Sequence, residues 1–161
     1  MNNPIQPGIR LAGTALAVVL GLGLAAPAVA EVQASDGWVR ATAPGAKVAA
    51  AYLTLRNTGD EDRKLLKIVS PVSDEVSIHR TSITETGVAR MWPMALLAVD
   101  AGTTLRLEAS GLHVMLNALK TPLVAGQKVP LTMKFDGGEA EFTLVLEVRP
   151  LTAGADGHAH H

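Results

Sequence analysis

Apolar and polar side chains alternate in short runs from Glu31 to Pro150, and turn-forming residues separate the runs. Successive side chains of a β-strand point to opposite faces of a sheet, so this alternation is typical of strands that bury one face. The segment shows no sustained repeat of apolar residues at the spacing of an amphipathic helix. The pattern therefore predicts an all-β fold.

Eight runs carry the alternation, and they predict seven or eight strands. The runs are Val32 to Ala41, Val48 to Arg56, Lys64 to Val69, Glu75 to Thr81, Thr103 to Leu107, His113 to Leu119, Val129 to Phe135 and Ala140 to Val148. Short antiparallel strands at this spacing bury one face and leave the other in water. We therefore expect a Greek-key β-sandwich or small barrel.

The last two runs form the clearest hairpin, because Asp136-Gly137-Gly138 between them tolerates the positive φ of a tight turn. The inward face is apolar and consists of Val129, Leu131, Met133, Phe135, Ala140, Phe142, Leu144, Leu146 and Val148. The pattern assigns Met133 to the core and leaves Met94 undecided.

Residues 1–30 are expected to be a secretory signal peptide, since Arg10 precedes the apolar run Leu11 to Ala26 and Ala28-Val29-Ala30 is a small-x-small cleavage site. A transmembrane anchor is the alternative, but Pro27 and several glycines argue against it. The whole 161-residue chain is 48% apolar and 18% charged. This composition predicts that residues 31–150 form one globular domain. Residues 151–161 are expected to form a disordered tail.

Composition excludes several classes of function. With no cysteine, the chain is expected to carry neither a disulfide nor a lipid anchor, and to be freely soluble outside the cytoplasm. A blue-copper electron carrier needs a cysteine thiolate, so the lack of cysteine also excludes this class of function. Without the first thirty residues, thirteen Lys and Arg face fifteen Asp and Glu, which does not favour nucleic acid as a partner. Asp74, Ser77 and His79 lie on one strand and cannot converge as a triad, so no enzyme is predicted.

Two histidines and two methionines stand out as a candidate metal site: His79, Met91, His113 and Met115. They include every histidine outside the last four residues. Thioether sulfur is a soft ligand and imidazole nitrogen a borderline one, so the set favours copper, above all Cu(I), over calcium, magnesium or manganese.

Strand alternation predicts where these side chains point. His113 and Met115 lie two residues apart, so they share one face of a strand, and His79 should likewise face away from the core. Met91 lies in a segment that we expect to be irregular, between a glycine-containing turn and Pro93, and to fold back over the strand ends.

The spacing of the four residues resembles the signature of the PCu(A)C-type periplasmic copper chaperones. Eleven residues separate His79 from Met91, twenty-one separate Met91 from His113, and one separates His113 from Met115. The likeness extends over roughly Glu31 to Pro150. Its most recognisable parts are Gly111-Leu112-His113-Val114-Met115-Leu116, Leu119-Lys120, Pro122-Leu123, Gly126 and Val129-Pro130-Leu131-Thr132.

The resemblance implies a cupredoxin-like barrel that binds Cu(I) in the periplasm. It also implies that the protein passes copper toward the binuclear centre of cytochrome c oxidase, directly or through another assembly factor. One position departs from the family pattern, because Arg80 stands where a methionine often follows the first histidine. Regular alternation would aim Arg80 at the core, so we expect a bulge or a strand end there.

Two further hypotheses remain open. His158, His160 and His161 form a second candidate site, able to take Cu(II) or nickel, and the alternative is a solubilising tail. The whole domain could also be a secreted β-sandwich that binds a protein partner without any metal.

Overall fold

A computed structural model describes residues 31–137 and 141–153, and every regular element in these ranges is a β-strand. The strands are β1 (Val32–Arg40), β2 (Ala49–Asn57), β3 (Arg63–Val69), β4 (Ser73–Ile83), β5 (Ala89–Pro93), β6 (Ala98–Val99), β7 (Thr104–Leu107), β8 (Leu112–Leu119), β9 (Lys128–Phe135) and β10 (Phe142–Arg149). The predicted all-β class is confirmed. The described residues contain no helix suited to crossing a membrane.

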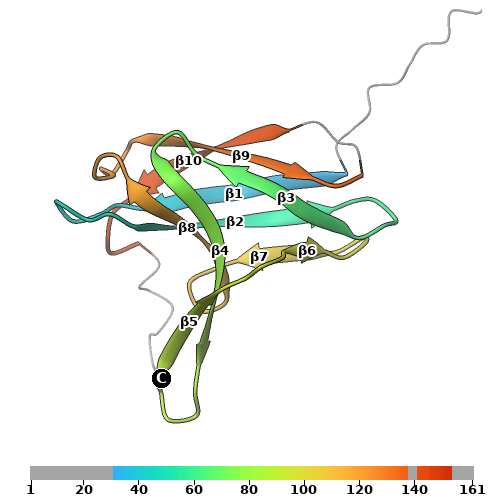
Figure 1. Cartoon of the computed structure of the whole chain (residues 1–161), viewed down its shortest axis with the longest axis horizontal. Helices are drawn as coiled ribbons and strands as arrows, with labels where there is room; N and C mark the ends of the chain where they lie inside the picture. The colour runs from blue at the N-terminus through green and yellow to red at the C-terminus, as the bar shows by residue number, and fades with distance from the viewer. Residues whose placement is uncertain (1–30, 138–140, 154–161) are drawn as a thin grey trace, which may run out of the picture.

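The strands pair in the order β5-β4-β8-β2-β1-β10-β9-β3-β6, and β7 also pairs with β2. The β1–β10 pair is parallel and the other pairs are antiparallel. The sheet folds over on itself into a sandwich-like body, from which β4 and β5 extend (Figure 1). Strand β2 is bordered by β8 along residues 49–51 and by β7 along residues 53–56.

Alternate residues of the long strands fill the interior, as the sequence pattern predicts. The core includes Ala51, Leu53 and Leu55 of β2, Val114 and Leu116 of β8, Val129, Leu131, Met133 and Phe135 of β9, and Leu146 and Val148 of β10. Burial of one such large side chain contributes about 2 kcal/mol. Met133 is 1% exposed, so its assignment to the core is confirmed. Met94, left undecided by the sequence, packs against this core as a partly buried side chain.

Strand β1 contains a bulge just before Trp38, where Asp36 adopts a φ of 54°. The extra residue reverses the alternation along the strand. Val32 and Val39 therefore both reach the core although they lie seven positions apart, a spacing that would place them on opposite faces of a regular strand. Trp38 and Arg40 lie on the outer face of the sheet as a result.

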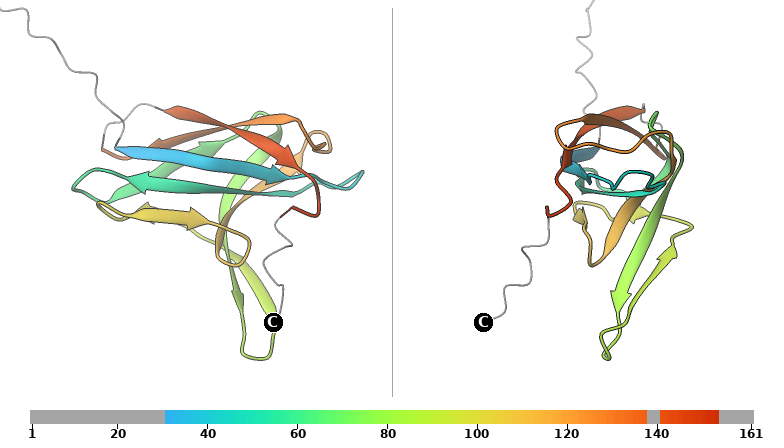
Figure 2. Two further views of the ribbon diagram at one scale, coloured as in Figure 1. Left: turned by 180° about the vertical axis from the view of Figure 1, so that it is seen from behind. Right: turned by 90° about the vertical axis from the view of Figure 1, so that its left-hand side faces the viewer.

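The structure contains two strands that the pattern does not predict, β5 and β6. β5 pairs with the distal part of β4, and the two form a hairpin that projects from the body (Figure 2). The expectation that Met91 lies in an irregular segment is wrong, because Met91 lies within β5 and pairs with Thr81. All five residues of β5 are exposed, so burial imposes no alternation on its sequence.

The expectation of a bulge or strand end at Arg80 is also wrong. β4 continues to Ile83, and Arg80 pairs with Leu112 of β8 and Trp92 of β5. Pairing with β8 ends at Arg80, and beyond it the strand leaves the body as one arm of the hairpin, so an inward-pointing side chain at this border reaches solvent rather than core. Arg80 is accordingly exposed.

Candidate metal centre

Strand register places all four predicted ligands on one face of the sheet. His79 of β4 lies directly opposite His113 of β8, and two residues further along Ser77 lies opposite Met115. On the other side of β4, Thr81 lies opposite Met91. Directly opposed residues of antiparallel strands point to the same side, as do residues two apart on one strand. The face is the outer one, because Val114 and Ile78 point into the core.

His113 is almost fully buried, with 4% exposure, although it lies on the outer face. Its Nδ1 is 3.2 Å from the carbonyl oxygen of Gly111, and its Nε2 is 3.1 Å from Sδ of Met91. A carbonyl oxygen can only accept a hydrogen bond, so this contact favours the tautomer in which Nδ1 donates and Nε2 carries the lone pair. The lone pair of Nε2 is then directed at the thioether sulfur, and two soft or borderline donor atoms lie side by side.

The imidazole ring of His79 has one hydrogen-bonded nitrogen and one without a partner. Its Nε2 is 3.1 Å from Oγ of Ser77, which also accepts a hydrogen bond of 3.0 Å from Nδ2 of Asn117. Its Nδ1 is buried and has no hydrogen-bond partner. The rings of His79 and His113 lie 6.2 Å apart, centroid to centroid. One imidazole nitrogen therefore remains free for a ligand while the other is held by Ser77.

The environment of His79 favours the neutral imidazole that metal binding requires. Burial lowers the pKa of His79 below its ordinary value, and the proximity of His113 lowers it further. Glu75 opposes both effects by raising the pKa. The net direction is downward, so His79 is less readily protonated than a free histidine.

The two methionines differ in exposure. Met91, on the projecting hairpin, is 53% exposed, whereas Met115 is half-buried on β8 between Ser77 of β4 and Ala50 of β2. One sulfur is thus within easy reach of solvent or of another protein. The other is held in the surface of the sandwich.

Sequence reasoning did not identify three residues that surround the candidate ligands: Tyr52, Ser77 and Asn117. The ring of Tyr52 is 6.5 Å from that of His113, Ser77 contacts His79, and Asn117 donates a hydrogen bond to Ser77. The alternation of β4 and β8 does place Ser77 and Asn117 on the ligand face. Tyr52 could not be found in this way, because the pairing of β2 with β8 is a long-range contact.

The structure brings His113 into contact with Met91 and places the His79 ring 6.2 Å from that of His113, and strand register adds Met115 to the group. The tail histidines, His158, His160 and His161, lie outside the described residues. Within residues 31–137 and 141–153, no three His, Asp or Glu residues gather closely enough to hold a metal ion. Any metal on this face would therefore depend on thioether donors.

Comparisons with known proteins agree with this fold. A family profile described as "Putative lipoprotein LpqE-like" matches residues 32–146. A protein of Leifsonia xyli subsp. xyli with a similar lipoprotein description is 35% identical over 139 residues, which cover 79% of this chain and 82% of the relative.

Solved structures are similar as well. The solution structure of apo-DR1885 from Deinococcus radiodurans is 30% identical, covers 93% of this chain and 97% of its own, and has a TM-score of 0.56. The Cu(I) form of DR1885 is 32% identical, with coverage of 80% and 83% and a TM-score of 0.56. A copper-bound PCuAC domain from PmoF2 has a TM-score of 0.63 at 20% identity, covering 76% of this chain and 96% of that domain. The predicted cupredoxin-like sandwich and the resemblance to PCuAC-type copper chaperones are both confirmed.

Proposed function

Because this chain belongs to the LpqE-like family and has the fold of PCuAC copper-binding domains, we propose that it is an extracytoplasmic Cu(I) carrier. Copper is its cargo, and His79, Met91, His113 and Met115 are its ligands. The observation that carries the proposal is the contact of 3.1 Å between Nε2 of His113 and Sδ of Met91, beside the unpartnered Nδ1 of His79.

The chemistry of the donor set favours a carrier over a storage site. Thioethers need no deprotonation and do not form disulfides, so they remain ligands in an oxidising compartment. Met91 is half exposed on a projecting hairpin, where the ligand of an acceptor can replace it first. Because an acceptor can replace the exposed ligand first and the others in turn, Cu(I) can be released faster than from a fully buried site.

The destination and location are part of the same proposal. We infer delivery toward the binuclear copper centre of cytochrome c oxidase, directly or through another copper assembly factor, after export to the periplasm by a signal peptide at residues 1–30. The lipoprotein description of the relatives supports an envelope location. Residues 31–150 would form the carrier domain, and no catalytic role is proposed.

The tail would serve as an auxiliary site. Three imidazoles in four residues, His158, His160 and His161, suit Cu(II) better than the thioether-containing face does. Truncation after Ala153 should remove Cu(II) binding and leave Cu(I) binding unchanged. Loss of Cu(I) binding on truncation would contradict two separate sites.

An anaerobic competition titration against a Cu(I) chelator tests the main proposal. The mature chain should bind one Cu(I) ion tightly, and Met91→Leu should weaken binding by more than tenfold. Met94→Leu is the matched control, because Met94 packs against the core and should leave affinity unchanged. Equal affinity in wild type and Met91→Leu would favour the alternative, a protein-interaction module that needs no metal.

A further inference from the structure

Two arginines and two aromatic rings form a continuous row on the same outer face as the candidate ligands. The guanidinium carbon of Arg149 lies 5.2 Å from the centroid of the Trp38 ring. The rings of Trp38 and Tyr52 are 4.6 Å apart, and the guanidinium carbon of Arg40 lies 5.8 Å from the Tyr52 ring. We call Arg149, Trp38, Tyr52 and Arg40 the arginine–aromatic row.

Neither guanidinium group of the row has a carboxylate partner among the residues that the structure describes. The ion pairs between described residues involve Arg63, Lys67, Lys120 and Lys128, and neither Arg40 nor Arg149. Glu147, two residues before Arg149, pairs with Lys128 instead. Nε of Arg40 is buried with no hydrogen-bond partner. A buried charged donor without an acceptor is costly, and a carboxylate that bound the Arg40 guanidinium would offset part of this cost.

Strand register joins the two guanidinium groups and fixes their direction. Arg40 of β1 and Arg149 of β10 are neighbours in the parallel pair of strands, so their side chains lie next to each other on one face. The bulge before Trp38 turns this part of β1 outward. Stacking on Trp38 and Tyr52 holds both groups against the sheet, so less conformational entropy is lost when they bind a partner.

The row leads directly to the candidate ligands. Tyr52 lies between Arg40 and His113, whose ring is 6.5 Å from its own. Ala50, two residues from Tyr52 on β2, lies opposite Met115 of β8. A protein seated on the row would therefore also cover the His113 and Met115 side of the ligand face.

From this geometry we infer that the arginine–aromatic row docks an acidic segment of the protein with which copper is exchanged. The inference rests on the proposed carrier function and adds the partner's chemistry and its place of contact. Guanidinium groups bind carboxylates through paired, charge-assisted hydrogen bonds. Arg, Trp and Tyr are also the residues that most often contribute the binding energy of protein interfaces. The partner is accordingly a protein that presents glutamate or aspartate beside its own copper-binding side chains.

A pair of synthetic peptides tests the inference. One contains a Met-x-x-Met segment preceded by a run of glutamates, and the other has glutamines in place of the glutamates. NMR titration of the isotope-labelled mature protein should give a Kd about tenfold lower for the glutamate peptide at low salt. The Nε–H signal of Arg40 should shift on addition of the glutamate peptide, and the difference in Kd should shrink as salt is raised.

Substitutions in the row separate this inference from the carrier proposal. Arg149→Glu, at an exposed position, and Arg40→Gln should each remove most of the preference for the glutamate peptide, while Cu(I) affinity stays within twofold of wild type. Arg56→Glu is the control, because Arg56 is an exposed arginine at the far end of β2 and should keep the preference.

Three results would overturn the inference. They are equal Kd values for the two peptides, an unchanged preference in both row variants, and retention on phosphatidylglycerol vesicles without discrimination between the peptides. Each of these leaves the carrier proposal intact if Cu(I) still binds. Loss of tight Cu(I) binding in the wild-type chain would instead refute the carrier proposal itself.

Discussion

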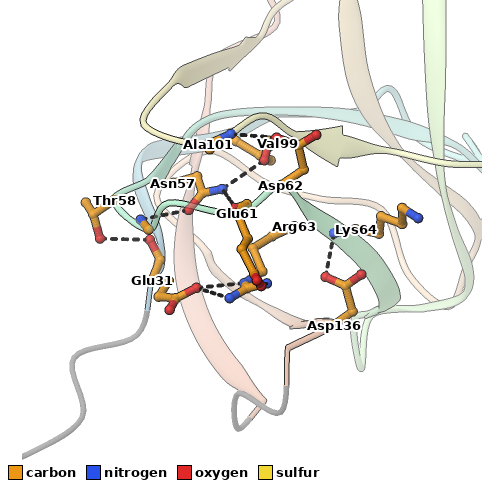
Figure 3. A network of polar contacts seen from close by, with 11 residues as sticks. Glu31, Asn57, Thr58, Glu61, Asp62, Arg63, Lys64, Val99, Ala101 and Asp136 are labelled. Atoms are coloured by element: carbon orange, nitrogen blue, oxygen red, sulfur yellow. Dashed lines mark hydrogen bonds and ion pairs between the residues drawn. The ribbon is translucent and has the colours of Figure 1, made fainter.

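Strand β2 connects two polar regions whose side chains are hydrogen-bonded to very different extents. Asn57, at its C-terminal end, is fully buried and donates hydrogen bonds of 2.7 and 2.9 Å to the carbonyl oxygens of Glu61 and Val99. Its Oδ1 accepts from the backbone N–H of Gly59 at 3.0 Å. Nearby, Arg63 forms ion pairs with Glu31 and Glu61 (Figure 3). This region ties together β1, β2, β3 and β6.

The candidate metal centre borders the opposite end of β2 and leaves donor atoms free. Nδ1 of His79 has no partner, Nε2 of His113 faces only a thioether, and Met91 is half exposed. Buried polar groups in proteins are normally satisfied, so unsatisfied ones require an explanation. The polar groups around Asn57 form hydrogen bonds that stabilise the fold, whereas several donor atoms of the candidate metal centre form none. Substitutions should therefore have separable effects in the two regions.

The largest expected effect tests the metal centre. His113→Ala should weaken Cu(I) binding more than a hundredfold, or by more than about 2.7 kcal/mol, because it removes an imidazole donor. The free energy of unfolding of the copper-free protein should fall by about 2 kcal/mol, because the buried ring leaves a cavity and one hydrogen bond to the fold is lost. Chelator competition and urea unfolding measure the two quantities. If His113→Ala greatly lowered stability but kept its Cu(I) affinity, His113 would serve the fold rather than metal binding.

Asn57→Ala should lower stability without affecting Cu(I) binding. It deprives two carbonyl groups and one N–H group of their partner, and should lower the free energy of unfolding by about 2 kcal/mol. Cu(I) affinity of the folded protein should stay within twofold of wild type. The same two measurements apply, and a parallel loss of affinity would show that the two ends of β2 are coupled.

The sequence predicts local features of this molecule better than those set by distant pairing. The alternation in β9 and β10 predicts their core faces because burial selects every second residue. The same reasoning places His113 and Met115 together. β5 is not predicted because no core lies beneath it, and the bulge in β1 is not predicted because it is defined by a shift in the pairing of β1 with β2.

The candidate site divides along the same line. Identity and spacing of the four candidate ligands come from the sequence, but the opposition of His79 to His113 depends on a register that no local pattern encodes. The position of Arg80 teaches the same lesson. Alternation correctly gives its direction, and only the projecting hairpin explains why that direction leads to solvent.

Ser77→Ala should reduce Cu(I) affinity less, because Ser77 contacts the candidate ligand His79 and is not itself a candidate ligand. Without its hydroxyl, Nε2 of His79 and Nδ2 of Asn117 both lose their contact, so the imidazole is less firmly oriented. Cu(I) affinity should fall about tenfold. Ser77→Thr retains the hydroxyl and suits a strand, so it should stay within twofold of wild type. Equal affinities in the two variants would show that the hydroxyl does not position His79.

The smallest effect concerns pH and the protonation of His79. Burial, followed by the proximity of His113, lowers the pKa of His79 despite the opposing effect of Glu75. In the unfolded chain His79 takes up its proton as pH falls through about 6.5. In the folded protein the His79 ring stays neutral to a lower pH. Between the folded and unfolded pKa values the folded state therefore binds fewer protons than the unfolded state. His79 therefore reduces stability as pH falls from about 6.5 to its folded pKa, with no further change below that value.

Copper binding should follow the same titration, because only the neutral ring can coordinate. The lowered pKa of His79 predicts that proton competition for this candidate ligand, and the decline in Cu(I) affinity that follows from it, begin below the pH at which a free histidine titrates. NMR titration of the copper-free protein should give a His79 midpoint below about 6.5. His79→Gln should remove this contribution to the pH dependence of unfolding, and Asn57→Ala should keep it. A midpoint at or above the free-histidine value would mean that the unpartnered Nδ1 is accessible to water, and the contrast between the two ends of β2 would then rest on Met91 and His113 alone.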